Sequence, residues 1–210
     1  MSASSVRSPK PPSAHVDDQA AENIPAELRN RDSWVCWAWR FRKGKQKPWD
    51  KPPINYATGR NIDETDPVNW LTFDRAREVS ANAADGIGFA LGDQGQADVH
   101  GLVGIDIDGC IDDQGTISPE ALELVKRFDS YTERTPSGHG LRILIHGRKR
   151  GDECRKPSHK DKFLANIDIY SCTRYLTVTG RILDGTPSAI VRSCKTIIIT
   201  YNARCAILLA

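Results

Sequence analysis

The sequence contains the run LVGIDID at residues 102–108. Side chains along a β-strand alternate between its two faces, so we expect Ile105 and Ile107 to point into a core. Asp106 and Asp108 then share the opposite face, roughly 7 Å apart. Two carboxylates on one rigid face repel each other unless a cation lies between them, and hard divalent cations prefer oxygen ligands. The run therefore predicts a strand with a metal site for phosphoryl or nucleotidyl transfer; two solvated acids are the plainer alternative.

A second run with the same pattern, NIDIY, follows at residues 166–170. Its isoleucines again mark a core face, and Asp168 lies on the opposite one. If the two strands are neighbours, three carboxylates converge. Three acids can hold two metal ions for the in-line displacement that polymerases and nucleases carry out. A lone acid beside a hairpin is the alternative for Asp168.

A turn flanked by glycines, TPSGHG at residues 135–140, precedes the strand expected at residues 141–146. Such a turn can present backbone N–H groups to a phosphate. Ser137, His139 and Arg142 would contact the same anion, and Arg142 is expected to face the same side as the acids. An ordinary connecting turn is the alternative.

Two basic stretches are candidates for contacts with phosphate. The first contains Arg40, Arg42, Lys43, Lys45, Lys47 and Lys51, close to Trp37, Trp39 and Trp49, and the second runs over residues 148–162. Basic side chains neutralise backbone phosphates and aromatic rings stack on bases. We therefore expect Lys51 and these stretches to bind nucleotide or nucleic acid, with core tryptophans and solvated lysines as the alternative.

Composition limits the class of protein. The chain has 210 residues, 29 Lys+Arg against 27 Asp+Glu, a net charge of +2 and 39% hydrophobic residues. This is enough apolar content for one core, and it excludes a disordered acidic or basic tail protein. We expect no membrane contact, because no run approaches the ~20 apolar residues of a membrane span. Six cysteines without a C-x-x-C pair, and no signal segment, predict free thiols, no zinc knuckle and a cytoplasmic location.

The order of the predicted elements favours an α+β fold over a doubly wound sheet, because strands and helices do not alternate regularly. Strands are predicted at residues 34–41 with one apolar face, and at 86–91, 102–108 and 141–146. Residues 167–170 and 175–179 are expected to pair with each other. Helices are predicted at residues 26–29, at 73–80 after the cap Thr72, and after Ser118-Pro119. The last helix would bury Ala121, Leu124, Val125 and Phe128.

The two ends of the chain differ from its middle. Residues 1–22 are rich in Ser, Pro, Ala and charge and predict a disordered leader. Residues 186–210 form an atypical apolar tail. This tail is either a last strand with a docked end or the end of a truncated chain, and it would favour aggregation if exposed.

From about residue 24 to residue 185, the order and spacing of the segments resemble the primase–polymerase domain of the archaeo-eukaryotic primase superfamily, in its phage and plasmid form. The segments are the tryptophan-rich strand with KPPIN and TG (34–60), DGIGF (85–89), VGIDIDGCID (103–112), SYTERTPSGHGLRI (130–143), IDIYS (167–171) and RYLTVTG (174–180). For residues 23–185 the resemblance implies a catalytic core like the RNA-recognition motif, with a small additional α/β module.

The resemblance also implies a function. It implies a metal-dependent nucleotidyltransferase, a DNA primase and DNA-directed polymerase, in the replication of a phage, plasmid or other mobile element. Asp106, Asp108 and Asp168 would hold two Mg²⁺ or Mn²⁺ ions that bind the triphosphate and activate the primer 3′ hydroxyl. Where the family usually has a phosphate-contacting histidine in the strand after the glycine turn, this chain has Arg142; His139, three residues earlier, is the alternative for that motif in a shifted register. DNA template and primer and nucleoside triphosphates would be the partners, and a replicative helicase on a separate chain would be a further one.

Two other functions fit parts of the sequence. A catalytically inactive nucleic-acid or nucleotide-binding module of the same fold would account for Arg142 and for the tail. A haloacid-dehalogenase-type phosphatase would use Asp106 as a nucleophile and Asp108 as acid and base. That family usually has Thr where Cys110 stands, and it needs a later acidic pair for which Asp168 alone is not enough. A polymerase would lose activity on Asp106→Ala, whereas DNA binding by an inactive module would not depend on Asp106.

Overall fold

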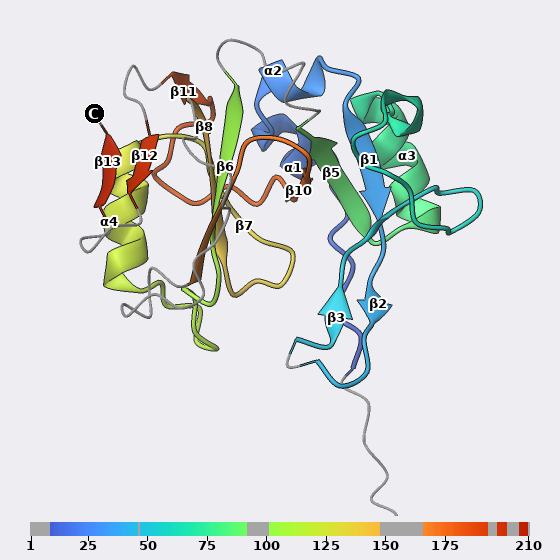
Figure 1. Cartoon of the computed structure of the whole chain (residues 1–210), viewed down its shortest axis with the longest axis horizontal. Coiled ribbons are helices and arrows are strands. Elements are labelled where there is room, and N and C mark those ends of the chain that lie inside the picture. Colours follow the sequence, from blue (N-terminus) through green and yellow to red (C-terminus); the bar gives the residue numbers. More distant parts are fainter. Residues whose placement is uncertain are drawn as a thin grey trace, which may run out of the picture.

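The computed structural model describes residues 9–45, 47–91, 101–147, 166–192, 197–200 and 206–209. Two main sheets are present in this part of the chain, one of four strands and one of five. Figure 1 shows them as two lobes, with helix α3 (Phe73–Ala83) on the outer side of one and helix α4 (Pro119–Phe128) on the outer side of the other. The mixed architecture with mainly antiparallel strands confirms the predicted α+β class.

The first sheet has the strand order β10-β5-β1-β4. These strands are β10 (Tyr175–Val178), β5 (Gly86–Ala90), β1 (Trp34–Trp37) and β4 (Pro53–Ile54). Helix α3 covers one face of it, beginning after Thr72, whose side chain accepts a hydrogen bond from the Arg75 N–H at 3.2 Å. The predicted cap is therefore confirmed, and the helix runs three residues beyond its predicted end at Ser80.

Strand β1 is buried on both faces, so the predicted strand with a single apolar face is wrong. Trp34 packs against Phe73 of α3, with ring centroids 4.9 Å apart. Trp37 points the other way and packs against Trp39 and Ala14. The extended run also stops at Trp37. Strand β2 (Arg40–Phe41) instead pairs with β3 (Trp49–Asp50) in a separate hairpin, which projects from the first sheet in Figure 1.

The second sheet has the order β11-β8-β6-β9, with β7 also paired to β8. Its strands are β11 (Val191–Arg192), β8 (Leu141–His146), β6 (Leu102–Ile107), β9 (Ile167–Tyr170) and β7 (Thr132–Arg134). Helix α4 begins at the predicted cap Ser118 and covers one face. As predicted, it buries Ala121, Leu124, Val125 and Phe128. Ile105 and Ile107 lie in the same hydrophobic cluster and are fully buried.

Strands β9 and β10 do not pair with each other, which corrects the predicted strand pair. Strand β9 pairs with β6 and β10 pairs with β5, so the chain crosses between the two sheets at residues 171–174. The reason is that their apolar side chains belong to different cores. Ile167 and Ile169 pack in the cluster below α4, whereas Leu176 and Val178 pack in the cluster below α3. Strand β10 is therefore the element of the first sheet that faces the second.

Both terminal stretches of the described chain contain regular elements. Helix α1 (Asp18–Asn23) begins within the stretch predicted as a disordered leader, residues 1–22, and Ala14 forms a bridge with Gly86. Ala14 and Ala21 are buried, which supplies the apolar contacts that order this segment. The short helices α2 (Ala26–Arg29) and η1 (Pro67–Asn69) complete the helical elements described, and α2 has its predicted bounds.

Within the stretch predicted as a tail, the second sheet continues past residue 185. Strand β11 pairs with β8, and the preceding Ile190 is buried in the core. Strands β12 (Ile197–Thr200) and β13 (Ala206–Leu209) form an antiparallel pair of their own. The three cysteines in the described ranges, Cys36, Cys110 and Cys172, are free thiols, as predicted. No helix of these ranges is long and apolar enough to span a membrane.

Candidate functional site

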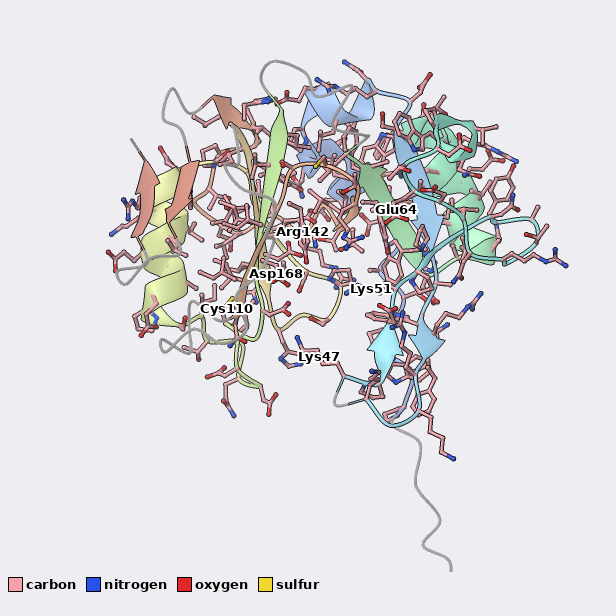
Figure 2. All side chains as sticks on the ribbon, viewed as in Figure 1. Lys47, Lys51, Glu64, Cys110, Arg142 and Asp168 are labelled. Atoms are coloured by element: carbon pink, nitrogen blue, oxygen red, sulfur yellow. The ribbon has the colours of Figure 1, made fainter. Side chains whose placement is uncertain are left out.

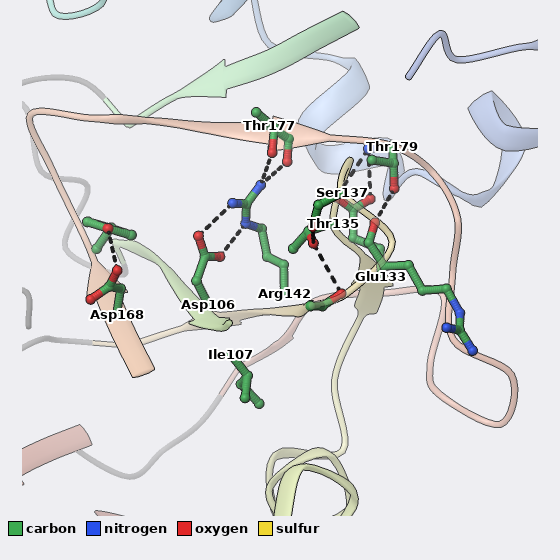
Figure 3. A network of polar contacts seen from close by, with 12 residues as sticks. Asp106, Ile107, Glu133, Thr135, Ser137, Arg142, Asp168, Thr177 and Thr179 are labelled. Atoms are coloured by element: carbon green, nitrogen blue, oxygen red, sulfur yellow. Dashed lines mark hydrogen bonds and ion pairs between the residues drawn. The ribbon is translucent and has the colours of Figure 1, made fainter. Parts of the chain in front are cut away.

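Four charged side chains stand in one row across the second sheet, one from each of four adjacent strands. Glu133 of β7 is the register partner of Arg142 of β8, Arg142 that of Asp106 of β6, and Asp106 that of Asp168 of β9. We call these four residues the charged row. Isoleucines at alternate positions of the strands fill the face toward α4, so the charged row lies on the opposite face, toward β10 (Figure 3).

Asp106 and Arg142 form a bidentate ion pair at the centre of the row. The Arg142 Nε donates to Asp106 Oδ1 at 2.6 Å, and Nη2 donates to Oδ2 at 2.7 Å. The Arg142 side chain is only 6% exposed and that of Asp106 17%. Burial acts to lower the pKa of Arg142, but the charge and hydrogen bonds of Asp106, together with the charge of Glu133, more than offset it and raise that pKa. The guanidinium is therefore a fixed cation in this site.

The same guanidinium links the two sheets. Its Nη1 donates to the hydroxyl of Thr177 in β10 at 2.7 Å and also to the carbonyl of Thr177. Figure 3 shows Arg142 between Asp106 on one side and Thr177 on the other. Since β10 belongs to the first sheet, the position of the charged row depends on both sheets.

Glu133 is fully buried at the other end of the row. Its carboxylate accepts hydrogen bonds from the Tyr131 hydroxyl at 2.9 Å, from the Thr179 N–H at 3.1 Å and from the Gly180 N–H at 2.9 Å. Burial raises the pKa of Glu133, opposed by the charge of Arg142 and by these donors. Glu133 thus holds the chain that leaves β10 against the second sheet.

Asp108 lies just beyond the end of β6, on the same face as Asp106. Its N–H still donates to the Asn166 carbonyl at 3.0 Å, so the backbone remains extended beside the start of β9. Lys47, which precedes β3, places its Nζ 2.7 Å from Asp108 Oδ2. The Lys47 side chain is 77% exposed, so water and salt weaken this pair.

Lys51 brings a third cation to the site. Its Nζ lies 5.1 Å from the centre of the Trp39 ring, and the Tyr175 hydroxyl donates to its carbonyl. Burial and the charge of Arg142 lower the pKa of Lys51, while Asp106 and Asp108 act in the opposite direction. Figure 2 shows Lys47, Lys51, Arg142 and Asp168 in the region between the two lobes.

The turn with Ser137 and His139 lies at the edge of the sheet where β6 ends. The Ile111 N–H donates to the His139 carbonyl at 3.2 Å, which ties the turn to the loop after Asp108. The Ser137 and His139 side chains are exposed. His139 Nδ1 lies 3.3 Å from the Ile111 carbonyl, and Ser137 Oγ lies 3.2 Å from Thr135 Oγ1.

The sequence left open whether the two acidic strands are neighbours; β6 and β9 are adjacent, and Asp106 is opposite Asp168. The predicted orientation of Arg142 toward the acids is confirmed. The second basic stretch, residues 148–162, lies outside the described residues. That these residues bind metal, nucleotide or DNA stays a prediction.

The carboxylates suit a hard divalent cation in their chemistry, because they offer only oxygen ligands from adjacent strands. Within the described ranges, however, no three His, Cys, Asp or Glu side chains come together as a metal-binding group. Asp106 instead faces Arg142, and Asp108 faces Lys47. An ion at this site would have to share these carboxylates with the cations of the protein itself.

Three contributors to the site were not predicted: Glu133, Thr177 and the pairing of Lys47 with Asp108. The signal for Glu133 is the turn itself, because a hairpin closed by residues 135–140 aligns Glu133 with Arg142. Thr177 has no such signal, since its contact joins two sheets that the sequence does not place side by side. The Lys47 contact likewise depends on the path of the hairpin of β2 and β3.

Comparison with known proteins agrees with the order of these segments. No protein-family model matches the chain. The chain is 33% identical over 168 residues to the DNA Primase-polymerase of Nitratiruptor phage NrS-1. The match covers 77% of this chain and 21% of that protein, so the chain spans about a fifth of the phage protein's length. This similarity supports a primase–polymerase domain of the phage type over most of the chain's length.

Proposed function

We propose that the charged row is the centre of a metal-dependent nucleotidyl-transfer site that acts in DNA replication of a phage, plasmid or other mobile element. The observation that carries the proposal is the register of β6 and β9, which sets Asp106 opposite Asp168 with Asp108 two residues further on the same face. Acids from two adjacent strands suit in-line displacement assisted by metal ions. The similarity to a phage DNA Primase-polymerase supports the same reaction class.

Asp106, Asp108 and Asp168 would hold Mg²⁺ or Mn²⁺. When bound, such ions neutralise charge on the triphosphate and favour ionisation of the attacking hydroxyl. The chain's own part is to position the reactants and to supply fixed charge. Lys51, held between Trp39 and the acids, is suited to bind a phosphate group. Ser137 and His139 expose side chains and a glycine-flanked turn at the same edge, where they would contact the triphosphate.

The hairpin of β2 and β3 is suited to hold nucleic acid. Phe41 and Trp49 pack edge to face on it, with ring centroids 5.4 Å apart. Basic side chains accompany them, and Lys43 and Lys45 are exposed at its turn. Cations neutralise backbone phosphates and aromatic rings offer stacking surfaces for bases. We therefore propose template or primer DNA as the partner of this hairpin, and we further propose that the core is related to the RNA-recognition motif.

One observation favours a second candidate function, a DNA- or nucleotide-binding module without catalysis. Both oxygens of Asp106 accept hydrogen bonds from Arg142, so a metal ion would find this carboxylate already engaged. In such a module the row would only stabilise the contact between the two sheets.

A primer-extension assay separates the two functions. The full chain is incubated with a labelled primer, a template and dNTPs, with Mg²⁺, with Mn²⁺ or with EDTA. We expect extension that requires a divalent ion and is lost in Asp106→Ala, while the matched variant Asp113→Ala, at an exposed acid of the following turn, stays active. The binding module predicts a different result: no extension with any metal ion, together with DNA binding that is sensitive to salt and unaffected by Asp106→Ala. That result would contradict catalysis.

A further inference from the structure

Arg142 has few donors left for a ligand. A guanidinium offers five N–H donors, and four hydrogen bonds are already formed: two to Asp106 and two to Thr177. The side chain is also buried. To bind the phosphates of a substrate, Arg142 would first have to give up Asp106 or Thr177. In this structure the acidic partner of Arg142 is Asp106, the carboxylate at the centre of the charged row.

The ion pair also affects how Asp106 can serve a metal ion. A bidentate guanidinium engages both carboxylate oxygens and cancels the charge that attracts a divalent cation. The situation at Asp108 differs, since its partner Lys47 is largely exposed and such a pair is weak. The two acids of the DID run are therefore unequal: Asp106 is held by a buried cation and Asp108 by a solvated one.

We propose that Arg142 is a positioning residue that acts as a built-in counter-cation for Asp106. It fixes the carboxylate between the two sheets when no metal ion is bound, and it competes with a divalent cation for the same oxygens. A cation that binds Asp106 has to share or displace the guanidinium. Because Nη1 of Arg142 also holds Thr177, occupation of Asp106 by a metal is coupled to the contact between the sheets.

This inference rests on the proposed function in one respect: the divalent cation that competes with Arg142 for Asp106 is the metal ion of that function. Its tests, however, do not measure nucleotide incorporation. The first test is a titration of the full chain with Mn²⁺, in which free Mn²⁺ is followed by electron paramagnetic resonance. The variant Arg142→Met removes the charge and keeps a long apolar stem. We expect it to bind Mn²⁺ about tenfold more tightly than the wild type, a coupling of ordinary size between two sites.

Two further variants test whether the tighter Mn²⁺ binding of Arg142→Met comes from Asp106. In Arg142→Met/Asp106→Asn the tighter binding should disappear, because the released carboxylate is then absent. Arg142→Lys keeps the charge without the planar fork and should bind Mn²⁺ with an affinity between those of the wild type and Arg142→Met. Unchanged or weaker Mn²⁺ binding in Arg142→Met, or a gain that persists in the double variant, would overturn the proposal.

The second test needs no variant at Arg142 and covers the case in which Arg142→Met does not fold. Urea unfolding is measured in EDTA for the wild type, Asp106→Asn and Asp168→Asn. If Arg142 is the counter-cation of Asp106, Asp106→Asn leaves a buried charge uncompensated and its midpoint falls below those of the wild type and Asp168→Asn. If Asp106 were a carboxylate that only repels its neighbours, Asp106→Asn would raise the midpoint, and that result would overturn the proposal. If primer extension fails, the proposed function is contradicted, but the Mn²⁺ titration and the urea unfolding still test the role of Arg142.

Discussion

The guanidinium of Arg142 in the second sheet donates to both the carbonyl and the hydroxyl of Thr177 in the first. Thr177 is 4% exposed, so this contact is shielded from water. The candidate site is therefore a property of the pair of sheets and not of either alone, because the residue that orients Asp106 is itself held by the neighbouring sheet.

Thr177→Val tests the contribution of the hydroxyl. Valine keeps the shape of the side chain but removes one acceptor from a buried cation. We expect the variant to lose about 1.5–3 kcal/mol of unfolding free energy, the range for a hydrogen bond to a charged group. Urea unfolding measures the loss, and Thr116→Val, at an exposed threonine, is the matched control. Equal stability of the two variants would show that the hydroxyl does not hold Arg142.

The two sheets also meet at an apolar contact that can be tested. A Cβ at Gly104 would lie 2.5 Å from Cδ1 of Leu176, which is buried in β10. Gly104→Ala should therefore destabilise the fold by about 1–3 kcal/mol, the usual range for overpacking. In the double variant Gly104→Ala/Leu176→Ala the methyl group has room, so the two losses should not add. Strictly additive losses would contradict this contact.

Glu133 gives a prediction for pH dependence. Burial raises its pKa in the folded state above the ordinary 4.5, so the folded chain keeps a proton that the unfolded chain releases. The unfolding free energy of the wild type should thus fall, relative to Glu133→Gln, as the pH rises from 4.5 toward the folded-state pKa. Urea unfolding at a series of pH values from 4.5 upward measures this difference.

The matched control for this series is Glu123→Gln, because Glu123 is exposed on α4. Its stability should follow that of the wild type at every pH. The opposite result, an unfolding free energy that rises with pH relative to Glu133→Gln, would contradict the prediction. It would show that Arg142 and the hydrogen-bond donors around Glu133 lower its pKa more than burial raises it.

Local patterns in the sequence were enough to predict the elements that carry the site. Alternation of isoleucine and aspartate predicted β6 and β9 and their polar face, and Ser118-Pro119 predicted the start of α4 and its buried residues. These features depend only on the strand and helix periods. The same periodicity explains why Asp106, Arg142 and Asp168 were expected on one side.

Contacts between distant segments could not be predicted in this way. Nothing local in residues 167–179 shows that β9 and β10 join different sheets, because both are short apolar strands. The burial of both faces of β1 depends on Ala14 and on α3, which cover it from opposite sides. For the same reason the sequence predicted Arg142 on the side of the acids, as a residue that binds phosphate, but the contact of its guanidinium with Thr177 could not be predicted.

Single-nucleotide addition to a primer tests the central claim most directly. The rate with Mn²⁺ is measured at saturating dNTP for the wild type, for Asp168→Asn and for the control Asp113→Asn. If the acids of β6 and β9 form one nucleotidyl-transfer site, the wild type and Asp113→Asn add a nucleotide at similar rates. Asp168→Asn should then be slower by roughly 10²-fold or more, as expected when electrostatic stabilisation of a transition state is lost. Equal rates for wild type and Asp168→Asn, or no addition by the folded wild type with any divalent ion, would contradict the account.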